Sequence, residues 1–126
     1  MKMIIAVAVG GALGSLARYF SSGYVMRLLG MEFPYGTLAV NIFGAFLMGF
    51  LVEALALKFS LSPALRGFLT VGVLGGFTTF SAFALEVALL IERNSYMQAA
   101  SYVSASVILG VGALFFGMFL GRAVIA

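Results

Sequence analysis

Four long apolar stretches restrict this chain to a membrane fold. They run from about Met3 to Tyr19 or beyond, from Tyr35 to Lys58, from Ala64 to Ile91, and from Tyr96 to Leu120. A transmembrane helix needs about 20 mostly apolar residues. Only 9% of the residues are charged, whereas a typical soluble domain has about 25%. The sequence therefore predicts an all-α membrane protein, with residues 1–126 forming one four-helix transmembrane domain.

The composition excludes several classes of function. The chain has no cysteine and no histidine, so disulfides, thiol catalysis and histidine-ligated metals are excluded. Seven basic and four acidic residues give a net charge of +3 without a basic run, which suits contact with lipid headgroups better than with nucleic acid. Lys2 precedes an apolar run, but glycines interrupt that run, so we expect a retained first span and not a signal peptide. We expect neither an enzyme nor a nucleic-acid partner.

The positive charges are nearly balanced between the two sides of the membrane. Four spans place both termini on one side, and the Lys/Arg difference between the sides sets the orientation of a membrane protein. The terminal side carries Lys2, Lys58, Arg66 and Arg122, and the other side carries Arg27 and Arg93, plus Arg18 if it counts as terminal. Because this difference is small, we predict insertion in both orientations and an antiparallel homodimer.

A polar interruption lies inside the third stretch, in the run Gly75-Gly76-Phe77-Thr78-Thr79-Phe80-Ser81-Ala82-Phe83. Gly-Gly is the least costly place to interrupt a helix, and backbone freed at membrane depth needs protein, water or an ion as a partner. Phe80 and Phe83 follow on one helix face. The run predicts a broken helix near Gly75–Thr79 with an ion site. The alternative is a kink with two packing phenylalanines.

Further polar residues are expected at membrane depth. Asn41 lies inside the second span, with Thr37 one turn earlier on the same face. The Asn41 amide could donate to an anion or bond a neighbouring helix. In the fourth span, Tyr102, Ser106 and Gly110 form a stripe that could line a water-filled track or a packing seam.

The phenylalanines have a possible role toward an anion. An aromatic ring is positive around its edge, so edges that face a narrow passage can accept a small anion. Asn41, Thr79 and Ser81 would add donors. Arg18 could attract anions into a vestibule or extend to the headgroups. A carboxylate at Glu86 would oppose an anion, so we expect it to be bonded, protonated or offset.

Small residues recur at spacings that let helix backbones approach closely. The pairs are Gly10 and Gly14, Ala45 and Gly49, Gly72 and Gly76, and Gly117 and Gly121. Their number predicts a tightly packed bundle. We also expect Ser62 to cap the third span, Pro63 to occupy its first position, and the fourth span to end at Gly121-Arg122.

These motifs together resemble the Fluc family of fluoride channels, also called CrcB-type proteins. The match covers the whole chain and includes three motifs, Gly10-Gly11-Ala12-Leu13-Gly14-Ser15-Leu16-Ala17-Arg18-Tyr19, Gly36-Thr37-Leu38-Ala39-Val40-Asn41-Ile42-Phe43-Gly44 and the run from Gly75 to Phe83.

The resemblance implies passive fluoride export across a bacterial inner membrane by an antiparallel homodimer with two pores. It implies that Phe80 and Phe83 line each pore and that Asn41 donates to fluoride. A structural sodium ion would bind backbone carbonyls of Gly75 and Thr78 from both subunits. Tyr102 and Ser106 would form the matching track on the fourth helix.

Two other classes of function compete with a fluoride channel. A small dual-topology exporter of cationic drugs needs a membrane-embedded carboxylate, which the first span lacks, and no tryptophan is available for a cation cage. A non-transporting helical scaffold would leave the break beside Asn41 and the paired phenylalanines without a role.

Overall fold

The protein is a bundle of long helices in a computed structural model that describes residues 1–57 and 60–125. Helix α1 spans Lys2–Leu29, α2 spans Tyr35–Leu57 and α6 spans Tyr96–Ile125. The third span contains α3 (Pro63–Gly67), the π-helix η1 (Phe68–Leu74), α4 (Gly75–Phe77) and α5 (Phe80–Glu92). Within the described residues, four helical segments are long and apolar enough to cross a membrane, as the sequence predicted. Lys58, the expected end of the second span, lies outside the described residues.

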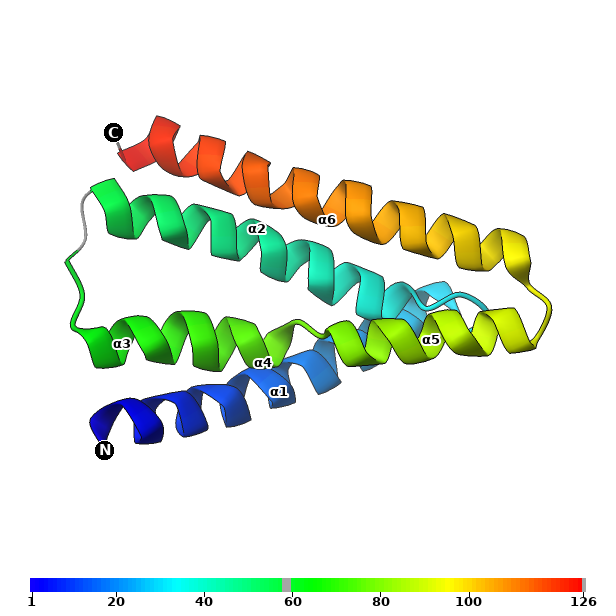
Figure 1. Ribbon diagram of the computed structural model, residues 1–126, viewed down its shortest axis with the longest axis horizontal. Helices are drawn as coiled ribbons and strands as arrows, with labels where there is room; N and C mark the ends of the chain where they lie inside the picture. The colour runs from blue at the N-terminus through cyan, green and yellow to red at the C-terminus, as the bar shows by residue number, and fades with distance from the viewer. Residues whose placement is uncertain (58–59, 126) are drawn as a thin grey trace.

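The four spans run alternately up and down (Figure 1). Helices α1 and α3 begin, and α2 and α6 end, at the same end of the bundle. This arrangement confirms that both termini lie on one side. We call this the terminal end, and we call the end with the turn at Asn94 the loop end. Helix α2 lies beside α6, and α1 crosses behind the third span.

The helix boundaries follow the local sequence except at the end of α6. Ser62 Oγ accepts a hydrogen bond from Leu65 N at 3.2 Å and Pro63 is the first residue of α3, as predicted. The prediction that the fourth span ends at Gly121-Arg122 is wrong, because α6 continues to Ile125. Gly121 packs against Glu53, and Arg122 Nη2 donates to Glu53 Oε1 at 3.0 Å. Gly121 therefore serves close packing and does not stop the helix.

The glycines allow the helix backbones to touch. A Cβ atom at Gly14 would overlap the Val73 carbonyl on the third span, and one at Gly117 would overlap the Phe46 carbonyl on α2. Overpacking of this kind typically costs about 1–3 kcal/mol or more. The tightly packed bundle that the glycine spacing predicted is confirmed.

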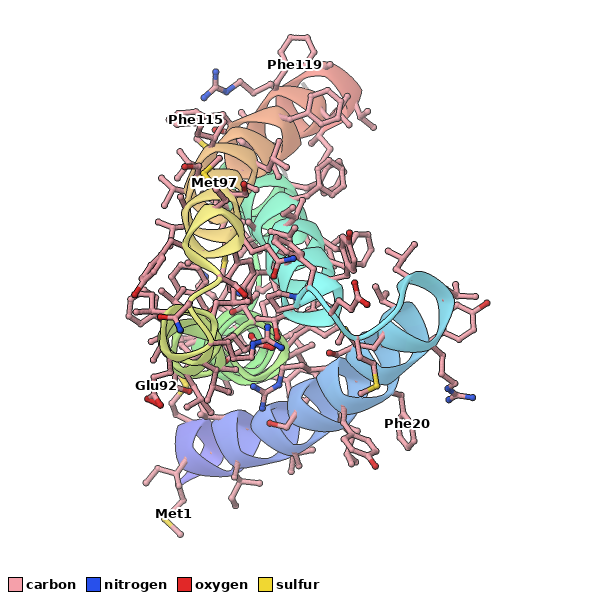
Figure 2. All side chains as sticks on the ribbon, turned by 90° about the vertical axis from the view of Figure 1, so that its right-hand side faces the viewer. Met1, Phe20, Glu92, Met97, Phe115 and Phe119 are labelled. Atoms are coloured by element: carbon pink, nitrogen blue, oxygen red, sulfur yellow. The ribbon has the colours of Figure 1, made fainter. Side chains whose placement is uncertain are left out.

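Large apolar side chains cover the outside of the bundle. Figure 2 shows Phe20, Met97, Phe115 and Phe119 projecting away from the helices, and each is more than half exposed. The interior is small by comparison, with Tyr102 and Leu90 as the largest fully buried side chains. This inversion is typical of a protein whose outer surface faces lipid.

Candidate functional site

The helix break lies on two threonines and not on the two glycines. Gly75 and Gly76 are helical, whereas Thr78 (φ −92°, ψ 159°) and Thr79 (φ −153°, ψ 124°) are extended. A break near Gly75–Thr79 is confirmed, but its assignment to Gly-Gly is wrong. Gly76 has another role, since a Cβ there would come within 2.7 Å of the Gly11 carbonyl on α1.

Side-chain hydrogen bonds explain why the threonines hold the break. Thr78 Oγ1 and Thr78 N both donate to the Leu74 carbonyl at 3.0 Å, which completes the helix before the break. Thr79 Oγ1 accepts from Ala82 N at 3.1 Å and thereby caps α5. Threonine suits both roles, because it favours extended backbone and is a good N-cap.

Asn41 on α2 holds the extended backbone from the side. Its Nδ2 donates to the Thr79 carbonyl at 3.0 Å, and its Oδ1 accepts from Thr79 N at 2.8 Å. This pairing is the interhelical hydrogen bond that the sequence left open as the alternative. Because an amide NH₂ carries two hydrogens, one Asn41 hydrogen is still available to a ligand.

The break also leaves four carbonyls, those of Gly75, Gly76, Phe77 and Thr78, without their usual helical donors. In a continuous helix, Thr79 N would donate to the Gly75 carbonyl and Ala82 N to the Thr78 carbonyl. Here Thr79 N bonds Asn41 Oδ1, and Ala82 N bonds Thr79 Oγ1. The Gly75 and Thr78 carbonyls, which the family resemblance implies as sodium ligands, are two of these four.

A cavity of about 380 Å³ opens beside the break, between α2, the third span and α6. It brings together several of the predicted site residues, namely Asn41, Thr78, Thr79, Phe80, Phe83 and Ser106. The other lining residues, which sequence reasoning missed, are small or apolar: Gly44, Ala45, Met48, Leu74, Val107 and Leu114. We call this the mid-span cavity. Among the described residues, none that lines it has an ionisable side chain.

The hydrogen-bond donors of the mid-span cavity are neutral, and only some of them are bonded to an acceptor within the described protein. Ser106 Oγ is buried and has no hydrogen-bond partner among the described residues. Thr79 Oγ1 lies 3.3 Å from Ser81 Oγ, so Ser81 adjoins the cavity through Thr79. Thr78 Oγ1 already donates to Leu74. The open donors are therefore the Ser106 hydroxyl, the second Asn41 hydrogen and the Thr79–Ser81 hydroxyl pair.

The two phenylalanines differ in their surroundings. The rings of Phe80 and Phe83 lie 5.6 Å apart at an angle of 47°. Phe83 also packs against Tyr102 at 5.1 Å, whereas Phe80 is 79% exposed. The aromatic pair therefore reaches from the interior of the protomer to its surface.

Tyr102 and Glu86 form a separate hydrogen-bonded pair. Tyr102 is fully buried and its hydroxyl donates to Glu86 Oε1 at 3.0 Å. Neither residue lines the mid-span cavity. The expectation that Glu86 is bonded or offset is therefore confirmed, while the predicted place of Tyr102 in a water-filled track stays a prediction.

Arg18 lies in a second polar cavity on the α1 side of the break. This cavity, of about 360 Å³, is lined by Ser15, Arg18, Tyr19, Ser22, Gly23, Thr37, Thr79 and Ala82. Thr37, which the sequence placed with Asn41, lines this cavity and is 7% exposed. Thr79 lines both cavities. The break therefore lies between a cavity that contains the charged Arg18 and the mid-span cavity, which has no ionisable lining residue.

The fold and the site thus define a multi-pass membrane protein with an interrupted third helix and a polar mid-span cavity. Comparison with known proteins supplies the family, since residues 5–118 match the family described as CrcB-like protein, Camphor Resistance (CrcB). The chain belongs to this family.

Curated relatives match along nearly their whole length. The chain is 52% identical over 126 residues, all of both chains, to a protein of Rhodospirillum centenum named fluoride-specific ion channel FluC. It is 50% identical over 122 residues to the protein of that name from Agrobacterium fabrum, covering 97% of this chain and 98% of the relative. A Caulobacter protein of the same name is 51% identical over 123 residues, covering 97% and 96%. The family is one of ion channels and not of enzymes.

Proposed function

We propose that this protein is a passive, fluoride-selective channel. The observation that carries the proposal is the mid-span cavity, where neutral donors and an aromatic pair meet beside a helix break at membrane depth. Relatives of the same length, about half of whose residues are identical, are named fluoride-specific ion channels.

The chemistry of the cavity suits a small, strongly hydrated anion. Fluoride that leaves water needs replacement donors, and the Ser106 hydroxyl and the remaining Asn41 hydrogen are available for this. The positive edges of Phe80 and Phe83 would add weak attraction without a fixed charge. An anion held by neutral groups can leave again, which conduction requires. In a bacterial inner membrane, an inside-negative potential would drive fluoride out with about 2.3 kcal/mol per charge per 100 mV.

Fluoride efflux from liposomes reconstituted with the purified protein tests this function. We expect rapid fluoride release that follows the membrane potential, needs no proton gradient and leaves chloride trapped. Release that requires a proton gradient would indicate a coupled transporter, and the absence of release would indicate a scaffold. Either result would contradict the proposal.

The site also supports assembly as an antiparallel homodimer. Phe80 is 79% exposed on the single protomer. Gly75 is also exposed, and a Cβ added there would come no closer than 3.6 Å to a neighbouring atom. A pore residue on the protomer surface needs a covering element, and a second copy in the opposite orientation supplies one. We therefore propose two pores per dimer, each lined by residues of both subunits.

Charge placement gives a prediction about this assembly. Two lysines added to either terminus should fix the orientation, because the native Lys/Arg difference is small. Because both termini lie on one side, either variant expressed alone should lose fluoride efflux, and co-expression with a variant that carries the two added lysines at the loop end should restore it. A single uniform orientation of the unmodified protein, measured by accessibility labelling, would contradict dual topology.

The same break fits a structural sodium ion. The Gly75 and Thr78 carbonyls lack their helical donors, and carbonyl oxygens are ligands that suit small hard cations. The described residues contain no cluster of three or more His, Cys, Asp or Glu side chains that could hold a metal. We propose that two such breaks, one from each subunit, surround one sodium ion with four carbonyls. Bound there, the ion would satisfy freed backbone and hold the dimer together.

Replacement of Gly75 tests this sodium site. In the protomer, a Cβ at Gly75 would meet only the Thr70 carbonyl, at 3.6 Å, and alanine favours a helix over glycine by about 1 kcal/mol. Gly75→Ala should therefore fold but lose dimer stability and fluoride efflux, because the added methyl crowds the ion and the partner. Thr78→Ser should keep both, since its ligand is a backbone atom.

Gly112→Ala is the matched control, because Gly112 is likewise exposed, has no neighbour within 4 Å and lines neither the mid-span cavity nor the Arg18 cavity. The decisive measurement combines sodium replacement by a large organic cation with a search for ion density between the breaks. Unchanged dimer stability and efflux after exchange, together with no density, would rule out the ion.

A further inference from the structure

Another cavity lies between α2 and the third span, on the terminal side of the mid-span cavity. It has a volume of about 330 Å³ and is lined by Val52, Leu55 and Ala56 of α2 and by Arg66 and Thr70 of the third span. We call it the terminal cavity, and we call the space that contains both cavities the groove. Figure 1 shows α2 and the third span moving apart toward this end.

The two cavities follow one stripe of each helix. On α2 the lining residues continue from Asn41, Ala45 and Met48 to Val52 and Ala56, at the spacing of three or four residues that keeps side chains on one helix face. On the third span, Leu74, Thr70 and Arg66 continue in the same way. Arg66 therefore stands at the outer end of the groove whose inner end holds Asn41 and Phe80.

The charge on Arg66 is not compensated locally. Arg66 is exposed, and the one ion pair among the described residues joins Arg122 to Glu53. Glu53 is the acidic residue near the terminal end, and its side chain is only 12% exposed. The other three acidic side chains, at Glu32, Glu86 and Glu92, belong to the loop end. Because Arg122 holds Glu53, the terminal cavity keeps the positive charge of Arg66.

Arg66 is also the charged side chain of the terminal cavity and could interact with an anion there. Thr70 Oγ1 donates to the Arg66 carbonyl at 2.8 Å, so the Thr70 hydrogen is already used. The other lining residues are apolar. A guanidinium does not lose its proton at any physiological pH, and low-dielectric walls strengthen the field of a charge in a cleft.

We propose that Arg66 forms an anion-attracting mouth, which concentrates fluoride at the outer end of the groove before it loses water at the mid-span cavity. This inference rests on the proposed function, because it assigns an access route to that same pathway. Arg66 would act by long-range attraction and not by tight binding. Its contribution should therefore depend on ionic strength, since the Debye length falls from about 30 Å at 0.01 M to about 3 Å at 1 M.

Fluoride efflux through Arg66→Gln at low and high ionic strength tests whether Arg66 attracts fluoride to the terminal cavity. The protein is reconstituted in zwitterionic liposomes at subsaturating fluoride, with an impermeant salt setting the ionic strength. At about 0.01 M we expect roughly threefold lower efflux than wild type, the Boltzmann factor for a unit charge about 6 Å away in a water-like dielectric. At about 1 M the difference should disappear, and Arg66→Lys should behave like wild type at both.

Lys2→Gln is the matched control. It removes one positive charge from the same end, but Lys2 is on the first turn of α1 and lines neither cavity, so efflux at low ionic strength should fall less than in Arg66→Gln. An equal fall in Arg66→Gln and Lys2→Gln at low ionic strength would contradict a specific role of Arg66, because it would show that only the total charge at this end matters. A loss that is the same at both ionic strengths would also overturn the proposal, because it would show a packing or lipid-headgroup role. Failure of the wild type to release fluoride would instead contradict the proposed function.

Discussion

Fluoride efflux through Phe80→Ile is expected to fall about tenfold, which corresponds to about 1.4 kcal/mol. Isoleucine keeps an apolar side chain but has no positive ring edge, and aromatic geometry is worth about 0.5–1.5 kcal/mol beyond buried area. Phe80 is 79% exposed on the protomer, so its replacement should leave the protomer folded. The measurement is efflux per reconstituted dimer, with size-exclusion chromatography to verify the dimer.

Phe115→Ile is the control for this prediction. Phe115 is 63% exposed and projects outward from α6 (Figure 2), and it does not line the mid-span cavity, so the same chemical change there should leave efflux unchanged. Phe83→Ile should also reduce efflux, with an added cost in stability because Phe83 packs against Tyr102. Normal conduction in both Phe80→Ile and Phe83→Ile would show that the aromatic edges do not carry the anion.

Asn41→Asp is expected to abolish fluoride efflux and to destabilise the protein. A carboxylate can still accept from Thr79 N, but its second oxygen would face the Thr79 carbonyl, where Asn41 Nδ2 now donates at 3.0 Å. Losing that bond and leaving a buried acceptor unpaired costs about 1–3 kcal/mol. An ionised carboxylate beside the mid-span cavity would also repel the anion. Efflux and thermal unfolding in detergent measure the two effects.

Asn94→Asp makes the same chemical change where it should be harmless. Asn94 lies in the turn before α6, and its Oδ1 accepts from Tyr96 Oη at 3.1 Å, a bond that a carboxylate keeps. Its φ of 61° also suits aspartate. Wild-type efflux from Asn41→Asp with an ionised carboxylate would remove Asn41 from the pathway.

Much of the fold follows from sequence because its signals are local. Apolar length defines the spans, and Ser62-Pro63 marks the start of α3 through the cap that Ser62 makes. Glycine spacing predicted close packing, which Gly14 and Gly117 show. The same residue type misled at Gly121, because a glycine that ends a helix and a glycine that admits a neighbouring side chain look alike in one sequence.

The candidate site was predicted as a set of residues but not as an arrangement. Helix propensity alone favours a break at Gly75-Gly76, but Gly76 is needed for contact with α1. The break falls at Thr78-Thr79 because Asn41, 38 residues away, bonds the Thr79 backbone. No pattern of neighbouring residues in the sequence indicates these hydrogen bonds between Asn41 and Thr79. The sequence identifies Arg66 only as a charge on the terminal side, since its place in the groove depends on how α2 and the third span diverge.

The most direct test of the pathway uses the absence of cysteine from the chain. Ser106→Cys would place a single thiol at the unpaired hydroxyl position of the mid-span cavity, and Ser104→Cys would place one at an exposed position of α6 that does not line this cavity. Both reconstituted variants are treated with a small thiol-reactive methanethiosulfonate, modification is verified by mass spectrometry, and fluoride efflux is measured before and after. We predict that modification blocks efflux through Ser106→Cys and leaves Ser104→Cys unaffected. Undiminished efflux from fully modified Ser106→Cys would contradict passage of fluoride through this cavity.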